Sequence, residues 1–503
     1  MNYSHLFLST LPETVLEVAA LLVLVVDLGF LRKSDLKTRT SVATLLGVIG
    51  CTAALWAQFW TSEAHGIWGY GVEGSHHLLL FNLRWAGAAQ AGILVLTGLT
   101  LLLLTGSAFT RHAGEYVAVV LMSATGGLII SSARDLLIIF IGLELLSLGL
   151  YILTAFAKAS GRSAEAALKY YLFGGMSAAF LLFGFSYLYG LTGSTNLEQI
   201  AAAISNSSAI AASPLLYVAW VAIAAGLGFK VAAVPFHLWA PDTYEGAPAP
   251  AAAFIASVSK VASFALLITI VSEVFSPKLS LVLVVLVAAS MLVGNLAALA
   301  QVSVRRLLAY SAIAHAGYML LALAYLRIDE SASWWEGAKA FGSANAVLYY
   351  ILSYGLTTVG AFGVIGVVER ATGSDRMDAF LGLHKRSPLL AAVLLVLFLS
   401  LAGIPPLVGF WAKFNLFAAV LSASEGVLPF TLVALAVAMS AVSLYYYLQV
   451  LKRAYVMSAV DDSRIRVNPV TAMVLLLIAA AVVVMGCFPD LLRAWIASFY
   501  PVL

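Results

Sequence analysis

Long runs of apolar residues follow one another along almost the whole chain. A membrane-spanning helix needs about 20 such residues, and a hydropathy window finds about fourteen runs of that length. Because lipid offers no partner to an open backbone N–H or C=O group, each run is expected to be helical. The predicted spans are residues 13–31, 41–60, 85–107, 113–132, 136–157, 164–190, 214–240, 249–272, 280–300, 306–326, 342–368, 388–422, 427–451 and 469–488.

Composition places the chain among membrane proteins. Of its 503 residues, 62% are hydrophobic and 10% are charged, with a mean hydropathy of +1.00; a soluble domain carries about 25% charged residues. The segments between the predicted spans are short, so no large soluble domain is expected. The net charge of +3 comes without a separate basic cluster, so we expect no nucleic-acid partner.

The positions of the 27 lysines and arginines predict the orientation of the chain. With the first loop placed in the cytoplasm, most basic residues fall at inner helix ends, as the positive-inside rule requires. The smaller outer set is Arg84, Arg134, Lys278, Arg327, Lys339 and Arg493. Both termini are therefore expected on the outer, periplasmic side. The N-terminus has no basic region before its first apolar run, so no cleaved signal peptide is expected.

Motifs for redox and nucleotide chemistry are missing from the sequence. The two cysteines, Cys51 and Cys487, both lie in apolar runs, and no Cys-x-x-Cys pair exists to hold an iron–sulfur cluster, zinc or haem. The stretch Gly69 to Gly74 matches the dinucleotide pattern G-x-G-x-x-G, but it lies between spans without the required strand and helix. We therefore expect no cofactor in this chain.

The spans are arranged as two possible repeats. Spans four to eight and nine to thirteen form two blocks of five, and an odd number gives the blocks opposite polarity, which is a device of transporters. The fourth span of each block is interrupted, at Pro235 and at Gly403 to Pro406. These breaks are either transport sites or two proline kinks without function. The predicted units are 1–111 (three N-terminal helices), 112–274 and 278–456 (the repeats) and 465–503 (the C-terminal helix).

Four ionisable residues lie well inside predicted spans: Glu144, Lys230, Lys260 and Lys413. A charge at the bilayer centre costs about 2.5–3.5 kcal/mol on insertion scales, and such residues are functional by default. Glu144 lies about 14 Å deep, too far for a carboxylate to reach the surface. The alternatives are structural ion pairs or lysines that extend to the surface. Lys169, near an inner end, fits that last description.

Lysine and glutamate suit a proton carrier, because burial shifts their proton affinities toward the neutral range. An ion pair at about 4 Å is worth roughly 4 kcal/mol at an effective dielectric constant of about 20. Moving one charge across about 150 mV costs roughly 3.5 kcal/mol, so one ion pair is strong enough to gate one proton. His237 and His315 are candidate proton relays, and hydrogen-bonded core histidines are the alternative. His237 follows Lys230 by seven residues and shares its face if the helix continues.

Four segments carry a resemblance to the antiporter-like subunits of respiratory complex I, the proton-translocating NADH-quinone oxidoreductase. They are FKVAAVPFHLWAPD (residues 229–242) with YEGAP (244–248), RRLLAYSAIAHAGY (305–318), LELLS (143–147), and GIPP (403–406) with GFWAKF (409–414). The opening Leu11-Pro12-Glu13 and the lysine at Lys413 resemble subunit N in particular.

The resemblance implies that Glu144 pairs with Lys230, that Lys260 is a central relay and that Lys413 lies on the exit side. It implies that NADH, FMN, iron–sulfur clusters and quinone are bound by partner subunits, both membrane and peripheral, in a bacterial inner membrane. Two alternatives stay open: a subunit of an Mrp-type cation/proton antiporter, and a structural membrane scaffold whose buried charges only hold helices together.

Overall fold

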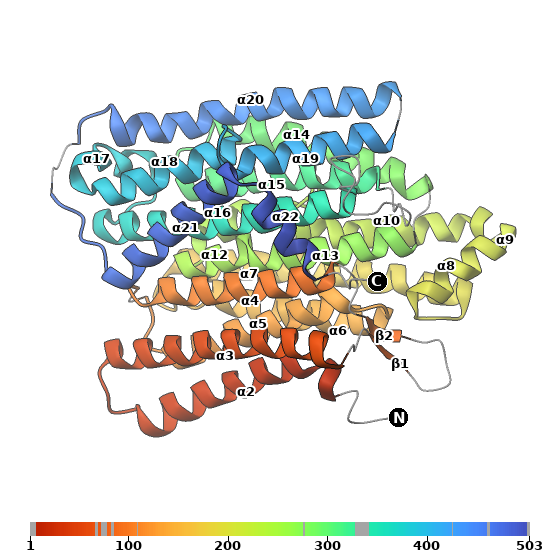
Figure 1. Cartoon of the computed structure of the whole chain (residues 1–503), viewed down its shortest axis with the longest axis horizontal. Coiled ribbons are helices and arrows are strands. Elements are labelled where there is room, and N and C mark those ends of the chain that lie inside the picture. The colour runs from red at the N-terminus through yellow and green to blue at the C-terminus, as the bar shows by residue number, and fades with distance from the viewer. Residues whose placement is uncertain are drawn as a thin grey trace.

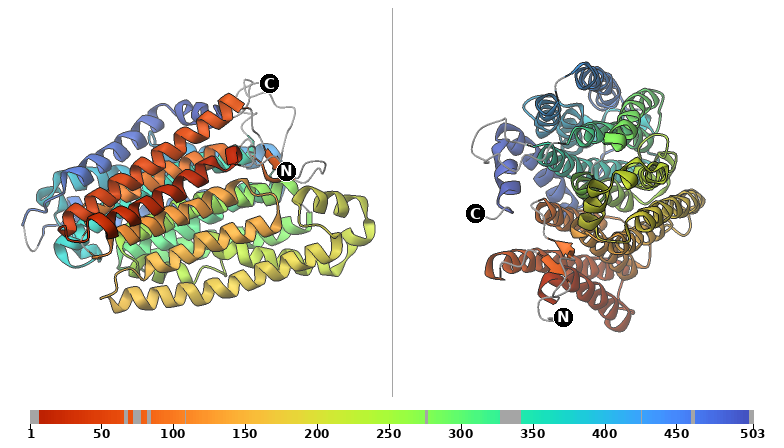
Figure 2. Two further views of the ribbon diagram at one scale, coloured as in Figure 1. Left: turned by 90° about the horizontal axis from the view of Figure 1, so that it is seen from below. Right: turned by 90° about the vertical axis from the view of Figure 1, so that its right-hand side faces the viewer.

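The computed structural model describes residues 7–65, 69–71, 78–81, 85–107, 109–274, 277–326, 342–424, 426–459 and 463–499. Its helices run roughly parallel to one axis, which is horizontal in Figure 1. Seen end-on in Figure 2, the N-terminal helices, the first block and the second block follow one another across the bundle. The C-terminal helices lie along one flank.

The elements follow one another in this order: α2 (Leu11–Val25), η1 (Val26–Phe30), α3 (Leu36–His65), β1 (Gly69–Gly71), β2 (Leu78–Phe81), α4 (Ala86–Leu104), α5 (Ala113–Ser132), α6 (Leu136–Thr154), α7 (Gly161–Thr192), α8 (Leu197–Asn206), α9 (Ser208–Ala212), α10 (Pro214–Val231), α11 (Trp239–Gly246), α12 (Ala249–Ala256), α13 (Val258–Glu273), α14 (Pro277–Leu299), α15 (Val304–Ala324), α16 (Ser343–Thr372), η3 (Met377–Phe380), α17 (Leu383–Arg386), α18 (Pro388–Ala402), α19 (Val408–Ala423), α20 (Val427–Tyr455), α21 (Pro469–Cys487) and α22 (Asp490–Ala497).

The predicted spans are present. In the described part of the chain, 12 helical segments are long and apolar enough to cross a membrane. The remaining two predicted spans are α2 with its π-helical end η1, and the pair α18 and α19, which are the two halves of the interrupted span 388–422. The prediction of an all-α membrane protein with about fourteen spans is confirmed in its main features.

Two details differ from that prediction. The segment between α3 and α4 contains two short strands, β1 and β2, which pair antiparallel. Gly69–Gly71 forms the first strand rather than the turn of a dinucleotide site, and Val72 to Gly74 lie outside the described residues. The segment before α10 contains the short helices α8 and α9. Residues 327–341, whose sequence fits an interfacial segment and a loop about equally well, are also outside the described residues.

The turns that follow α7 and α16 show the internal repeat most clearly. Both have the sequence Thr-Gly-Ser, at Thr192 to Ser194 and at Thr372 to Ser374. The central glycines, Gly193 and Gly373, have φ of +73° and +72°, a left-handed conformation that suits glycine. In each turn the serine N–H donates to the threonine hydroxyl. The two helices therefore end in the same way.

A hydrogen bond between two side chains lies beside each turn, and its donor and acceptor have changed places between the two repeats. In the first, the Thr195 hydroxyl donates to the Asp135 carboxylate at 2.5 Å. In the second, the Ser303 hydroxyl donates to the Asp375 carboxylate. Asp135 and Ser303 cap the N-termini of α6 and α15, so donor and acceptor have changed places between equivalent positions.

The two contacts lie at opposite ends of the bundle. The first adjoins α8, at the right of Figure 1, and the second adjoins η3 and α17, at the left. Equivalent contacts at opposite ends are what an inverted repeat produces. The structure thus contains two inverted five-helix repeats, each with a broken helix. The residue bounds chosen for the repeats from the sequence stay a prediction.

Candidate functional site: a line of buried cations across two broken helices

The first broken helix stops one residue after Lys230. Helix α10 ends at Val231, and Ala232 adopts a left-handed conformation with φ of 60°. Pro235 then prevents a regular helix from continuing, and α11 begins only at Trp239. His237 lies in this irregular stretch, so the continuous helix that would have placed it on one face with Lys230 is not present. Its ring is partly exposed, and Nδ1 has no hydrogen-bond partner among the described residues.

Lys230 is buried and donates a hydrogen bond to the hydroxyl of Ser147 on α6. Glu144 lies one turn before Ser147 on the same helix and is partly exposed on this chain. Within the described residues, no ion pair joins Glu144 to Lys230, although the two charges interact electrostatically. The ion pair that the resemblance implied is therefore not seen among the described residues, and Ser147, whose hydroxyl donates to the Leu143 carbonyl, lies beside the ammonium.

Lys260 lies at the centre of the bundle and is 1% exposed. Its Nζ donates to the carbonyl oxygens of Val231, at 3.3 Å, and Ala312, at 2.8 Å. Val231 is the last residue of α10, where carbonyl groups lack partners within the helix and the helix dipole is negative. A cation is favourable there, so the broken helix provides part of the solvation that Lys260 loses on burial.

The span that carries Lys260 is itself interrupted, which the sequence analysis did not anticipate. Helix α12 ends at Ala256 and α13 begins at Val258. Between them, the Ser257 hydroxyl donates to the Ala253 carbonyl at 2.6 Å. Such bonds from serine to the preceding turn bend helices. Lys260 therefore lies in the first turn of α13, next to a local distortion.

The second broken helix places Lys413 in the same way. Helix α18 ends at Ala402, and Gly403 follows with φ of +87°. Lys413, on α19, donates to the Ala402 carbonyl at 2.9 Å and to the Ser440 hydroxyl at 2.8 Å. Lys260 and Lys413 thus each donate to the last carbonyl group of the first half of a broken helix.

The charges of both lysines, Lys260 and Lys413, act on the ring of His315. Its ring is buried, and Nδ1 lies 2.7 Å from the hydroxyl oxygen of Tyr350 on α16. A small cavity borders the two rings and reaches Ser400 and Gly409, beside the second break. The cavity has room for about one water molecule. His315 therefore lies beside the second broken helix, within the electrostatic influence of the central lysine.

Neutral polar side chains complete this region, and the sequence analysis missed them. Ser311 is hydrogen-bonded to Tyr447. Asn295 donates to the hydroxyl of Tyr318 at 3.0 Å and accepts from that of Tyr446 at 3.3 Å. These residues are all buried inside the second repeat. The signal that could have identified them in the sequence is a tyrosine, serine or asparagine within an apolar span. That signal is weaker than a charged residue in the same place.

A charged cluster fixes α11 at the end of the bundle where α7 and α15 begin. Asp242 accepts from Lys169 at 2.8 Å and from Arg306 at 2.6 Å, and Arg306 also donates to Glu245 at 2.9 Å. Lys169 thus binds carboxylates, Glu165 among them, rather than merely extending into solvent. Partial burial opposes ionisation of Asp242, yet the bonds from Lys169 and Arg306 lower the pKa of its carboxyl below the ordinary value. The cluster joins the first repeat to the second.

A metal site is not part of this arrangement. In the part of the chain that the structure describes, no group of three His, Cys, Asp or Glu side chains is placed to hold a metal ion.

Comparisons with known proteins agree with this geometry. Residues 133–440 match the family model described as "NADH:quinone oxidoreductase/Mrp antiporter, TM". NADH-quinone oxidoreductase subunit N 2 of Acidobacterium capsulatum is 46% identical, over 99% of this chain and 99% of that protein.

Solved structures give the same result. A chain in the structure of respiratory complex I from Thermus thermophilus with bound aureothin is 32% identical, with a TM-score of 0.74, over 95% of this chain and 98% of that one. A chain of the Mrp complex from Dietzia shares the fold, with a TM-score of 0.80, at 21% identity. This chain therefore belongs to the NADH:quinone oxidoreductase/Mrp antiporter membrane family, among its NADH-quinone oxidoreductase subunit N members.

Proposed function

We propose that this chain carries protons across the bacterial inner membrane as the N subunit of a proton-translocating NADH-quinone oxidoreductase. One observation carries the proposal. Lys230, Lys260, His315 and Lys413 form a succession of buried proton-binding groups that crosses both broken helices. Intramembrane ionisable residues that line such breaks mark ion pathways.

The geometry supplies a way to move a proton along this succession. Lys260 holds its proton on an ammonium that donates to Val231 and Ala312. His315 lies within the field of both Lys260 and Lys413. Because like charges repel, a proton that arrives on His315 favours release of a proton from a neighbouring lysine. Lys413, beside the second break, then serves as the exit-side group.

Glu144 controls the other end of the succession. Its charge acts on Lys230, whose ammonium donates to Ser147 one helical turn further along α6. If Glu144 moved away or gained a proton, the ammonium of Lys230 would lose an attractive interaction and release its proton more readily. Glu144 is partly exposed on this chain, so a neighbouring subunit is able to influence it.

The driving reaction belongs to partner subunits. NADH, FMN, iron–sulfur clusters and quinone are bound there, and the chain assembles with peripheral subunits and with sister antiporter-like subunits in the membrane. Quinone reduction by NADH in those partners drives proton export. Both termini of this chain are proposed to face the periplasm, because basic residues concentrate at the opposite helix ends.

Purification and reconstitution test the proposal against its alternatives. The purified complex should contain flavin and iron–sulfur subunits, and proteoliposomes should acidify internally when NADH reduces quinone from outside. Cation-dependent proton exchange without redox subunits would favour the Mrp-type antiporter. Normal NADH-driven pumping after removal of the buried charges would favour the scaffold.

A further inference from the structure

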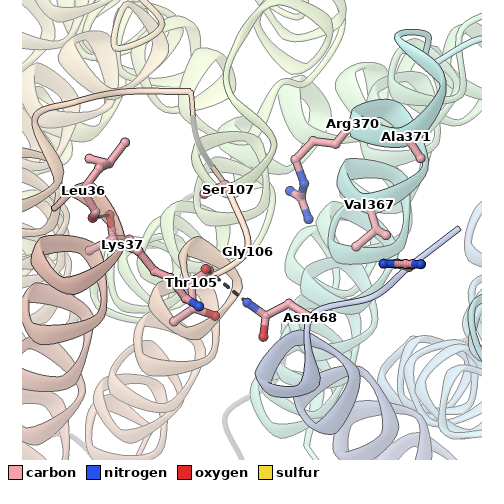
Figure 3. A pocket seen from close by; sticks show the side chains of 11 residues that line it. Leu36, Lys37, Thr105, Gly106, Ser107, Val367, Arg370, Ala371 and Asn468 are labelled. Carbon is pink, nitrogen blue, oxygen red and sulfur yellow. Dashed lines mark hydrogen bonds between the residues drawn. The ribbon is translucent and has the colours of Figure 1, made fainter.

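A recess opens at the inner end of the bundle, away from the line of buried lysines. Its lining residues come from the start of α3, the end of α4, the end of α16 and the segment before α21. Figure 3 shows this recess, with Asn468 donating to the Thr105 carbonyl at 3.3 Å across its floor. The N-terminal helices and the C-terminal helix therefore meet here.

Three cations line the recess: Lys37, Arg370 and Arg466. Among the described residues, none of the three forms an ion pair with a carboxylate. Glu369 precedes Arg370 in the chain, but its carboxylate lies 3.6 Å from the guanidinium of Arg305. The other polar lining groups are the hydroxyls of Thr40, Thr105 and Ser107 and the amide of Asn468. Among the described residues, the recess thus collects positive charge and hydrogen-bond donors without a carboxylate in ion-pair contact with them.

Arg370 also borders a second, smaller cavity, which extends inward between α4, α12 and α16. The hydroxyl of Thr471 lines that cavity, is 1% exposed and has no hydrogen-bond partner among the described residues. Gly106 lies between them, since a Cβ added there would meet the Thr471 hydroxyl at 3.0 Å and the Arg370 guanidinium at 3.4 Å. An unpartnered donor thus lies next to the cationic recess.

We propose that this recess binds the phosphodiester headgroup of an anionic phospholipid from the inner leaflet. Basic pockets between transmembrane helices on the cytoplasmic side suit such headgroups. The α3 and α21 helices both flank α4, and further along they carry exposed apolar side chains, Leu45 and Ile49 on α3 and Leu476 on α21. These surfaces match acyl chains, which favours a lipid over free phosphate.

The role of the lipid follows from the position of the recess. The helices that line it belong to the N-terminal unit, the second repeat and the C-terminal helix. A bound phosphodiester would place one negative charge among three like charges that otherwise repel one another across this junction. The site is separate from the proposed proton relay, so its loss should not remove the relay groups.

The test uses the whole complex in nanodiscs of phosphatidylcholine that contain a phosphatidylglycerol with a diazirine in its acyl chain. Irradiation should label peptides of α3 and α21. The triple variant Lys37→Gln, Arg370→Gln, Arg466→Gln should need more than about tenfold more probe for equal labelling, since each basic residue near the surface contributes about fivefold in affinity. Lys158→Gln, an exposed lysine at the same end of the bundle, is the matched control and should label as the unmodified complex does.

Three outcomes would overturn the proposal. Equal labelling of the triple variant would show that the cations do not hold the headgroup. Equal labelling by a phosphatidylcholine diazirine probe would show an unselective apolar groove. Full competition by millimolar inorganic phosphate would identify a free-anion site. Assembly of each variant is checked by the amount of complex recovered, and Arg370→Lys, which keeps the charge, should retain most of the labelling.

Discussion

The ammonium nitrogen of Lys260 lies 3.3 Å from the carbonyl oxygen of Val231, the residue that directly follows Lys230 and ends helix α10. Lys260 is thus hydrogen-bonded to the end of α10, the helix that carries Lys230, the adjacent group in the proposed relay. Release of the proton from Lys260 would remove a cation from a negative helix terminus. The protonation of Lys260 and the position of Lys230 are therefore coupled through the broken helix.

Both partners of the electrostatic interaction between Glu144 and Lys230 should be required for pumping. Glu144→Ala or Lys230→Ala is expected to lower NADH-driven proton uptake and quinone-linked activity while the complex still assembles. The measurement is dye quenching in proteoliposomes, normalised to the amount of assembled complex. Normal pumping by an assembled Glu144→Ala complex would remove the carboxylate from the account.

Ser147 is expected to transmit part of this interaction. Ser147→Ala removes the hydroxyl that accepts from Lys230, and a net hydrogen bond of about 1 kcal/mol corresponds to a rate effect of about fivefold. Ser177→Ala is the control, because its buried hydroxyl also bonds α10, at the Gly226 carbonyl, but touches no relay residue. If both variants pump equally, Ser147 is only a packing residue.

The shape of the second break should matter for function and not only for stability. Gly403→Ala places a Cβ at φ of +87° and 2.9 Å from Cδ of Lys413. The backbone strain costs about 1–2 kcal/mol, and Lys413 must also shift from Ala402. Gly373→Ala is the matched control, with φ of +72° and open space around the added carbon.

Thermal unfolding and pumping separate the two effects. Both variants are expected to lower the unfolding temperature of the complex, but only Gly403→Ala should slow pumping at a temperature where both remain folded. Equal pumping by the two variants would show that the placement of Lys413 is not critical.

The cluster around Asp242 should give a pH-dependent stability. Its carboxyl has a lowered pKa in the folded protein, so its ionised form contributes stability at pH values above the unfolded-state pKa of about 3.9. That contribution is lost as pH falls through the lowered folded-state pKa. Asp242→Asn should therefore increase hydrogen exchange in α11 at pH 7, with a difference that shrinks in strong acid. A difference independent of pH would contradict this origin.

Much of the fold was predictable from the sequence because the bilayer allows few solutions. Lipid forces each apolar run into a helix, so run length and the Pro235 and Pro406 breaks were sufficient to locate the spans. The repeat was harder to detect from sequence. Its clearest mark, the exchange of donor and acceptor between Thr195 and Asp135 in one copy and Ser303 and Asp375 in the other, preserves the interaction while changing every residue type.

The site was predictable where a charge was involved and not where the partner was backbone or hydroxyl. Lys260 was identified by its charge, but its acceptors are carbonyl groups, which the side-chain sequence does not display. Pro235 located the first break, but the left-handed turn at Ala232 that ends α10 before it was not visible in the sequence. Tyr350 and Asn295 are neutral, so their burial beside the relay became evident only in three dimensions.

The most direct test of the relay is the pumping activity of Lys260→Arg in the assembled complex. Arginine keeps a positive charge and donors for the carbonyl groups of Val231 and Ala312, but it does not release its proton at accessible pH. The account predicts a complex that assembles normally and has lost most of its NADH-driven proton uptake. Pumping at the level of the unmodified complex would contradict the relay and identify Lys260 as a structural cation.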